Sequence, residues 1–319
     1  GGLSVVSQSG ALGASLLLFA GDHPVPMGFS KFCHVGNGSD VNILEVLEYY
    51  AEDDSTKVVG MYLEGVSDGR AFMDVAQKVS RRKPLLVLKV GRSEQASAAA
   101  FSHTGSLAGS DRVYDGVFEQ IGAIRVASMD DLLCAAKAFS MQKLPPGNRI
   151  CVLTEAGGPG TVAADEIATS REGRLAEFSP KTVERLKGIL PPMAMVGQPD
   201  GYVDMSAAAM EEQHSAALKE VLRDDGVDAV IVISVPPTFL SPVQVAKGLL
   251  EAKEGSEKPV VVCLMAGDWV KDARVLLESG GIPTFDMPEQ AARAVLAMVK
   301  QARFQSKLAE NEPRGCVAL

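Results

Sequence analysis

One of the four histidines, His103, lies in a segment whose composition suits chemistry better than packing. Residues 92–109 are dominated by serine, alanine and glycine, and they are too many for a routine connection between a strand and a helix. Long loops of this kind often carry functional residues. Neutral imidazole can attack a phosphoryl group, so this context indicates a phosphohistidine. His23, His34 and His214 lack the context and are predicted to be ordinary packed or surface residues.

Polar residues that follow two apolar runs could complete such a site. An imidazole that attacks through one nitrogen needs an acceptor for the N–H of the other. Glu64 directly follows the apolar run 58–63 and could supply that acceptor. A solvated carboxylate at a strand end is equally consistent with its position. Asn37 and Asp40 follow the run 29–35 and are weaker candidates to lie beside a substrate.

Two glycine-rich segments could bind an anion where a helix begins. The first, Ser9-Gly10-Ala11, follows the first apolar run, and the second, Gly157-Gly158-Pro159-Gly160, follows an apolar run in the second half. Backbone N–H groups at a helix start carry partial positive charge, and glycine lets an anion approach them closely. A helix N-cap with a tight turn is the alternative for the first segment, and a structural glycine turn is the alternative for the second. Glu155 would repel an anion unless its side chain points away from the second segment.

The elements that must position these residues follow a regular pattern. Apolar β-branched runs of four to seven residues alternate with amphipathic stretches, which is typical of βαβ units with parallel sheets. The pattern occurs on both sides of residues 144–148, a Pro- and Gly-containing linker candidate. We therefore predict two flavodoxin-like, doubly wound α/β domains, over 1–143 and 144–303, and a tail or linker over 304–319. Ligands of such sheets bind beyond the carboxyl ends of the strands, where all the candidate residues fall.

The predicted strands are 3–6, 29–35, 58–63, 85–90, 123–126, 150–153, 229–235, 260–264 and 284–285. The predicted helices lie near 10–20, 41–52, 69–80, 110–121, 129–141, 161–171, 180–189, 207–223, 242–252, 269–279 and 288–302.

Composition excludes several classes of partner. The 319 residues carry a formal charge of -9 without a sizeable basic cluster, which argues against nucleic acid. The longest apolar runs are far shorter than the roughly 20 residues of a membrane-spanning helix, so no membrane association is expected. Isolated cysteines in apolar stretches, without a signal peptide, indicate a cytoplasmic protein. No metal site is expected. The last four residues, 316–319, fit a prenylation pattern, but no polybasic stretch precedes them and we expect no modification.

Several segments resemble, in order, the landmarks of the NDP-forming acyl-CoA synthetases, which include ADP-forming acetate–CoA ligases and belong to the succinyl-CoA synthetase superfamily. The segments are Val6-Ser7-Gln8-Ser9-Gly10-Ala11-Leu12, Tyr62-Leu63-Glu64-Gly65, Lys89-Val90-Gly91-Arg92, Ser102-His103-Thr104-Gly105-Ser106-Leu107-Ala108-Gly109 and Ala156-Gly157-Gly158-Pro159-Gly160. The similarity extends over roughly residues 1–302. It implies two succinyl-CoA synthetase-like domains, a phosphorylated histidine at His103 and a stabilising glutamate at Glu64. It also implies that the helix starts at Ser9-Gly10-Ala11 and Gly157 to Gly160 face the phosphate.

The resemblance implies a reversible cycle. Acyl-CoA and phosphate give an acyl phosphate, the phosphoryl group moves to His103, and a loop movement carries it to ADP. The family's CoA-binding and ATP-grasp domains are not found in this sequence, which also begins without Met, as a partial sequence would. ATP or ADP with Mg²⁺, and CoA, are therefore expected to bind mainly on those absent domains or on a partner subunit. A small carboxylic acid substrate and an oligomer are also expected, and the chain alone should be an incomplete enzyme.

Two departures from the family and two competing functions accompany this interpretation. Glu155 replaces the family's usual Asn, and residues 198–204 replace a compact Asn-Pro-Val-Asp. A regulatory, ligand-sensing module of a larger protein, such as an acetyltransferase fusion, is the main alternative, although such modules frequently lack the histidine. A flavodoxin-type FMN protein would fit the fold, but only 5% of the residues are aromatic and the candidate loops lack them. The acid, the choice of ADP or GDP, and the assembly stay open.

Overall fold

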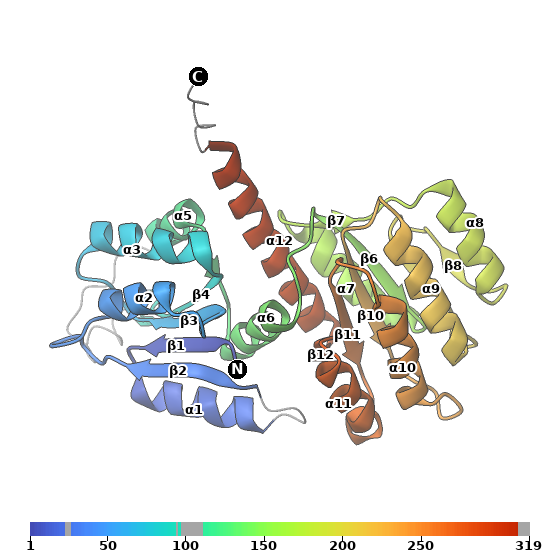
Figure 1. The fold of residues 1–319 in the computed structure, drawn as a ribbon, viewed down its shortest axis with the longest axis horizontal. Coiled ribbons are helices and arrows are strands. Elements are labelled where there is room, and N and C mark those ends of the chain that lie inside the picture. Colours follow the sequence, from blue (N-terminus) through green and yellow to red (C-terminus); the bar gives the residue numbers. More distant parts are fainter. Residues whose placement is uncertain (23–26, 94, 97–110, 312–319) are drawn as a thin grey trace. The chain divides into compact units, whose positions relative to one another are not determined.

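The computed structural model describes residues 1–22, 27–93, 95–96 and 111–311, and its strands form two separate sheets (Figure 1). The described residues divide into two compact units. The first comprises Gly1–Phe19, Gly28–Leu132 and the chain from Lys300 onward, and the second comprises Ala20–Met27 and Leu133–Val299. The domain boundary near residue 144 stays a proposal.

The first sheet contains five parallel strands in the order β2-β1-β3-β4-β5. Their bounds are β1 Leu3–Ser7, β2 Phe29–His34, β3 Val58–Leu63, β4 Leu85–Lys89 and β5 Ile124–Arg125. This order is the flavodoxin-like one, and it reverses direction between β1 and β3. Ser7 pairs with both His34 and Tyr62, so the carboxyl ends of three strands lie level at this switch point.

Helices cover both faces of the first sheet (Figure 1). They are α1 Gly10–Gly21, α2 Ile43–Glu52, α3 Gly69–Arg82 and α5 Asp111–Ile121, and α6 Met129–Met141 follows β5. The apolar faces of α2, α3 and α5 form one core with the sheet, in which Tyr50, Phe72 and Phe118 are fully buried. α1 lies on the opposite face. Asn42 caps α2 by accepting from the N–H of Leu44 at 2.8 Å, which fixes where that helix begins.

The second sheet has the order β12-β11-β10-β6-β9-β8, and β7 also pairs with β6. Its strands are β6 Arg149–Thr154, β7 Arg174–Leu175, β8 Met195–Val196, β9 Tyr202–Asp204, β10 Ala229–Ser234, β11 Val260–Leu264 and β12 Thr284–Phe285. All pairs are parallel except β8 with β9. Thr154 pairs with Ile233 on one side and Asp204 on the other, so these strands also end level.

The helices of the second unit are α7 Gly157–Thr169, α8 Pro180–Ile189, α9 Glu211–Arg223, α10 Pro242–Lys253, the 3-10 helix η1 Gly267–Val270, α11 Lys271–Ser279 and α12 Pro288–Asn311. The helices α8, α9, α10 and α11 form one core with alternate residues of the strands, such as Cys151 and Leu153 of β6. Ile150 points to the other face of the sheet. A Cβ at Gly173 would lie 2.8 Å from its Cδ1 and 2.7 Å from Cδ2 of Leu296 in α12.

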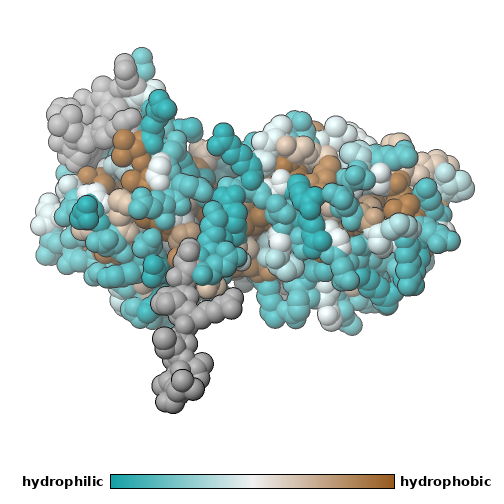
Figure 2. Space-filling model, turned by 90° about the horizontal axis from the view of Figure 1, so that it is seen from above, coloured by the Kyte–Doolittle hydropathy of each residue, from teal (hydrophilic) through white to brown (hydrophobic). Residues whose placement is uncertain are grey.

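The predicted fold class is confirmed, because both units are doubly wound α/β sheets with mainly parallel strands. Three short strands of the second sheet, β7, β8 and β9, were not predicted. α7 begins at Gly157 rather than 161, and α12 continues to Asn311 rather than ending near 302. No helix in the described parts of the chain is long and apolar enough to cross a membrane. The face in Figure 2 is hydrophilic over most of its area, with small apolar areas between.

Candidate functional site

The segment between β1 and α1 has a tight, hydrogen-bonded geometry. The hydroxyl of Ser7 accepts from the N–H of Ser9 at 3.1 Å and donates to its carbonyl at 2.7 Å. α1 then begins at Gly10, where the sequence predicts a helix start. The first N–H groups of a helix have no partner within it. Since α1 begins directly after the carboxyl end of β1, its first N–H groups lie at the carboxyl edge of the sheet. Ser9 and Gly10 are half-buried there, and Ala11 is exposed.

His34 lies against this helix start, which the sequence did not reveal. A Cβ at position 10 would come 3.1 Å from Cε1 of His34. A side chain at position 10 would therefore fit only if the exposed His34 ring shifted by a few tenths of an ångström. His34 is exposed and ends β2 opposite Ser7. Its register with Ser7 gave no local signal, because the two residues are 27 positions apart.

The segment that follows β3 is fixed by the side chain of Gln8. Its Oε1 accepts from the N–H of Glu64 at 2.6 Å and from that of Gly65 at 3.2 Å. Its Nε2 donates to the carbonyl of Gly65 at 3.1 Å. Glu64 is thereby held beside the helix start of α1, at the point where the strand order reverses. Gln8 was part of a sequence landmark but was not predicted as a site residue.

The carboxylate of Glu64 is half-buried, and one of its oxygens is enclosed. Within the described residues, Oε2 is buried and has no hydrogen-bond partner. Burial raises the pKa of Tyr62, and the charge and hydrogen bonding of Glu64 raise it further. Burial lowers the pKa of Lys89, which ends β4, against the attraction of Asp111 and Glu64. An enclosed acceptor without a donor marks a place where a further polar group fits.

His103 lies outside the described residues, so its position relative to Glu64 is a prediction. The chain leaves β4 through Gly91, whose φ of 75° favours glycine, and after the undescribed residues 97–110 α5 begins at Asp111. Arg125 of β5 pairs with Asp111 at 2.6 Å, and Arg92 approaches the same carboxylate at 3.9 Å. Asp111, at the start of α5, therefore lies between the side chains of Arg92 and Arg125.

The second unit repeats the geometry of the first at the start of α7. Here the hydroxyl of Thr154 accepts from the N–H of Ala156 at 3.0 Å and donates to its carbonyl at 2.9 Å. The helix begins at Gly157, three residues after Thr154, just as α1 begins three residues after Ser7. The same local structure at the end of each first strand gives each unit an equivalent helix start.

The three glycines at the start of α7 have different surroundings. A Cβ at Gly160 would lie 2.4 Å from Oη of Tyr202, and one at Gly157 would lie 3.0 Å from Oδ2 of Asp204. Gly158 is exposed and a Cβ there would meet nothing within 4 Å. Tyr202 donates to the carbonyl of Gly157 at 3.0 Å. A side chain at position 160 would therefore displace Tyr202, whereas position 158 has space for one.

Glu155 points away from the start of α7. Its Oε1 accepts from the hydroxyl of Ser234 at 2.8 Å and from the N–H of Val235 at 2.6 Å, and its Oε2 lies 3.4 Å from Nε2 of His214. Burial lowers the pKa of His214, but the hydrogen bond and charge of Glu155 outweigh it, so that this pKa is raised overall. The carboxylate is 3% exposed and is directed at the end of β10, so the charge conflict expected from the sequence does not arise.

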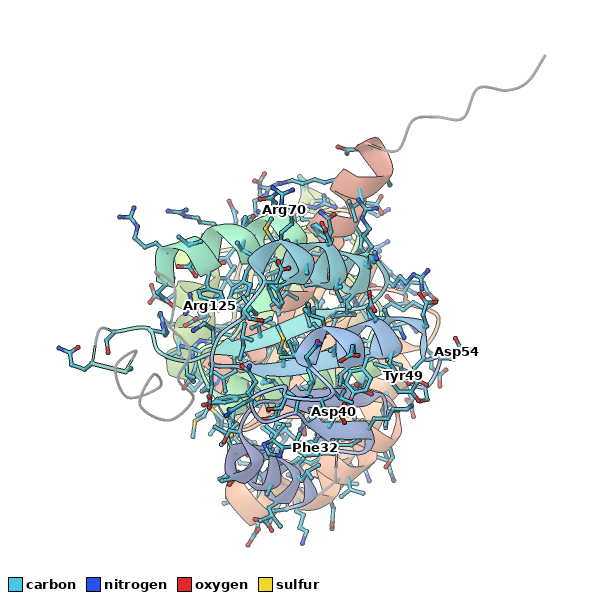
Figure 3. The ribbon with its side chains drawn as sticks, turned by 90° about the vertical axis from the view of Figure 1, so that its left-hand side faces the viewer. Phe32, Asp40, Tyr49, Asp54, Arg70 and Arg125 are labelled. Carbon is cyan, nitrogen blue, oxygen red and sulfur yellow. The ribbon has the colours of Figure 1, made fainter. Side chains whose placement is uncertain are left out.

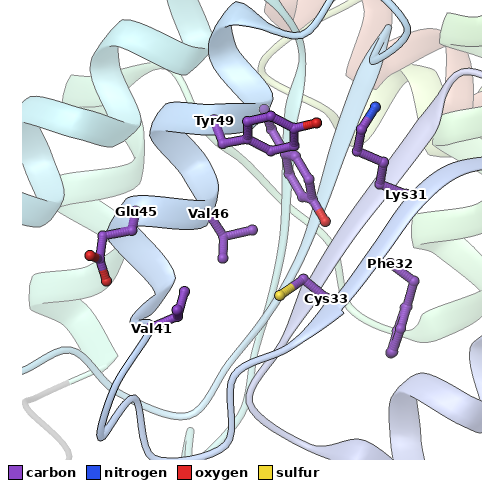
Figure 4. Close-up of a pocket in the computed structure, with 8 residues that line it drawn as sticks. Lys31, Phe32, Cys33, Val41, Glu45, Val46 and Tyr49 are labelled. Atoms are coloured by element: carbon purple, nitrogen blue, oxygen red, sulfur yellow. The ribbon is translucent and has the colours of Figure 1, made fainter.

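Asn37 and Asp40 are exposed in the loop after β2, where Figure 3 labels Asp40. Neither of them lines the cavity of about 520 Å³ between β2 and α2 shown in Figure 4. The charged groups of that cavity are already engaged. Lys31 pairs with Asp53 at 2.7 Å, and the carboxylate of Glu45 accepts from the N–H of Asn42, the N-cap of α2, at 2.8 Å. The cavity therefore offers no free charge to a phosphate or a carboxylate.

The fold and these segments define the class to which this protein belongs. Proteins of this class have two flavodoxin-like units, each with a glycine-rich helix start at the carboxyl edge of its sheet. The family model for a succinyl-CoA ligase like flavodoxin domain matches residues 1–139, and that for a ligase-CoA domain matches residues 150–309. The chain belongs to the NDP-forming acyl-CoA synthetase family, and the resemblance stated from its landmarks is confirmed.

Relatives with assigned activities extend over nearly all of the chain. It is 44% identical over 307 residues to the α subunit of ADP-forming acetate–CoA ligase II from Pyrococcus furiosus, a match that covers 95% of this chain and 66% of the relative. It is 33% identical to an ADP-forming 4-hydroxybutyrate–CoA ligase from Nitrosopumilus maritimus, over 94% of this chain and 42% of the relative. This chain therefore spans slightly less than two thirds of the length of the Pyrococcus subunit.

A solved structure supports the same assignment. The acetyl-coenzyme A synthetase 1 of Candidatus Korarchaeum cryptofilum, described as dinucleotide forming and determined in complex with phosphate and ADP, matches with a TM-score of 0.88. The two are 33% identical, and the match covers 99% of this chain and 68% of that one.

Proposed function

We propose that this chain is part of an ADP-forming acyl-CoA synthetase. The complete enzyme interconverts acyl-CoA, ADP and phosphate with a carboxylic acid, CoA and ATP, and the phosphoryl group passes through His103. The activities named for the relatives from Pyrococcus furiosus and Nitrosopumilus maritimus support the reaction class. The observation that carries the mechanism is the enclosed Oε2 of Glu64, at the switch point of the first sheet.

The enclosed oxygen supports a role for Glu64 in orienting an imidazole. A buried acceptor without a donor costs about 1–3 kcal/mol, so the site favours a group that brings an N–H. The imidazole of His103 has such an N–H, and its other nitrogen would then keep the lone pair that attacks phosphorus. His103 follows β4, the neighbour of β3, by a long segment, so its chain has the length to reach Glu64.

The two glycine-rich helix starts would hold the phosphoryl group. Negative charge develops on its oxygens, and each helix start would stabilise that charge by roughly 0.5–2 kcal/mol. In this proposal Ser9, Gly10 and Ala11 serve from α1, and Gly157, Gly158 and Gly160 serve from α7. The direction of the Glu155 side chain, toward the end of β10, supports the second set, because it removes a repulsive charge from the helix start.

The remaining functions belong to partners in this proposal. CoA and the adenine nucleotide with Mg²⁺ bind on a CoA-binding domain and an ATP-grasp domain, or on a second subunit, as the name of the Pyrococcus α subunit suggests. The acid is a small carboxylic acid, with Asn37 and Asp40 as weak candidates beside it. The protein acts in the cytoplasm as an oligomer.

Phosphorylation of the histidine tests the proposal directly. The protein is incubated with γ-labelled ATP, Mg²⁺ and a cognate ATP-grasp partner, and the label is assayed for acid lability and base stability. His103→Ala should abolish labelling, whereas His34→Ala should retain it. Glu64→Gln should slow it by on the order of 10²- to 10⁴-fold, the usual range for acid-base and orienting residues. Label that persists in His103→Ala, or that is lost only in His34→Ala, contradicts the proposal.

A further inference from the structure

We propose that Gln8 is a positioning residue that ties the start of α1 to Glu64, so that the phosphate-binding backbone and the histidine-orienting carboxylate form one rigid unit. The inference rests on the proposed function. It adds a residue that acts through Glu64.

Gln8 stands where two strands separate. The last backbone hydrogen bond between them runs from the N–H of Gln8 to the carbonyl of Tyr62 at 3.3 Å. Beyond this point the chain turns into α1 on one side and runs on through Glu64 on the other. The Gln8 side chain continues the pairing for two more residues of the segment that follows β3, Glu64 and Gly65. It therefore replaces the β-ladder at the place where the site requires the strands to part.

The contacts need an amide in particular. Gly65 offers both an N–H and a carbonyl to Gln8, at 3.2 Å and 3.1 Å, and only a group with an acceptor and a donor side by side satisfies both. The N–H of Glu64 shares the same acceptor at 2.6 Å. A carboxylate could not donate to the carbonyl, and an apolar side chain could form none of these bonds.

The consequence concerns the direction of the Glu64 side chain. Its backbone is held on both sides, by the β3 ladder before it and by Gln8 at and after it. With its backbone fixed, the carboxylate presents Oε2 to one enclosed place. Ser7 holds the backbone of Ser9 at 3.1 Å and 2.7 Å independently of the Gln8 amide, so loss of that amide should release the carboxylate while the helix start stays in place. Loss of partners that orient a reactive group typically costs about 10- to 100-fold in activity.

The experiment is a double-mutant cycle on the rate of histidine phosphorylation. Gln8→Met removes the amide at nearly constant length, and Gln8→Asn keeps the amide but withdraws it by one methylene; either variant suffices if the other fails to fold. Each is measured alone and combined with Glu64→Gln. Gln142→Met is the matched control, because that amide also bridges two chain segments, accepting from Val260 at 3.1 Å and donating to the carbonyl of Gly281, but it belongs to the second unit.

We expect the Gln8 variants to slow phosphorylation by about 10- to 100-fold in the wild-type background and by no more than about twofold in Glu64→Gln. Gln142→Met should leave the rate unchanged. Equal fold-losses in both backgrounds would mean that Gln8 does not act through Glu64, and a wild-type rate in the Gln8 variants would remove its role altogether. If the wild-type protein is never phosphorylated, the proposed function itself fails, and this inference fails with it.

Discussion

Replacement of Gly158 and of Gly160, two residues apart in the first turn of α7, gives a sharp test of how that helix start is built. Gly158 and Gly160 share the same turn and the same intrinsic helix propensity. Their surroundings differ: a Cβ at 158 meets nothing within 4 Å, whereas one at 160 would come 2.4 Å from Oη of Tyr202 and 2.7 Å from Cγ2 of Thr154.

The opposite surroundings predict opposite effects on stability. Overpacking of this kind costs about 1–3 kcal/mol. If the ring of Tyr202 moves aside, its 3.0 Å bond to the carbonyl of Gly157 is also lost, at about 0.5–1.5 kcal/mol. The gain in helix propensity from glycine to alanine returns roughly 0.5–1 kcal/mol. Gly160→Ala should therefore destabilise the second unit by about 1–3 kcal/mol, whereas Gly158→Ala should leave it unchanged or stabilise it by up to about 1 kcal/mol.

The chain contains a convenient reporter for this measurement. Its single tryptophan, Trp269, belongs to the second unit, so its fluorescence follows the unfolding of that unit in urea. With a slope of about 2 kcal/mol per molar urea, the midpoint of Gly160→Ala should fall by roughly 0.5–1.5 M. Tyr202→Phe should reduce this loss, because it removes the atom that the new Cβ approaches most closely. Equal midpoints for the two alanine variants would refute the packing described for Tyr202.

Two buried pairs give further predictions, both measured by urea unfolding. His214 has a raised pKa beside Glu155, so the pair should stabilise the second unit fully below about pH 6.5. This contribution should be lost as the pH rises through the folded-state pKa of His214. His214→Gln should abolish that part of the pH dependence, and a profile that this substitution leaves unchanged would contradict the assignment. Lys137 and Glu278 form a buried 2.9 Å ion pair, and Glu278 also accepts from the hydroxyl of Thr284. Glu278→Ala should therefore lower the free energy of unfolding by about 3–5 kcal/mol, and adding Lys137→Met should recover part of that loss. No recovery would mean that the unpaired ammonium of Lys137 is not the cause.

The sequence by itself determined the class of fold and the start of α1. Runs such as 58–63 and 260–264 became strands with the predicted bounds, because β-branched apolar residues bounded by turn residues specify a buried strand locally. Gly10 begins α1 as predicted, and Glu64 directly follows β3. These features depend on neighbours within a few positions, which a sequence displays.

Only the tertiary structure decided how those segments join into a candidate site. β9 was missed because three residues, Tyr202–Asp204, carry no periodicity, and that strand is stabilised by β6 rather than by its own sequence. The direction of the Glu155 side chain depends on the end of β10, about 80 positions further along the chain. The link from Gln8 to Glu64 spans 56 positions. Each of these contacts follows from the register between strands, and register is set by the packing of the whole sheet rather than by the residues that it brings together.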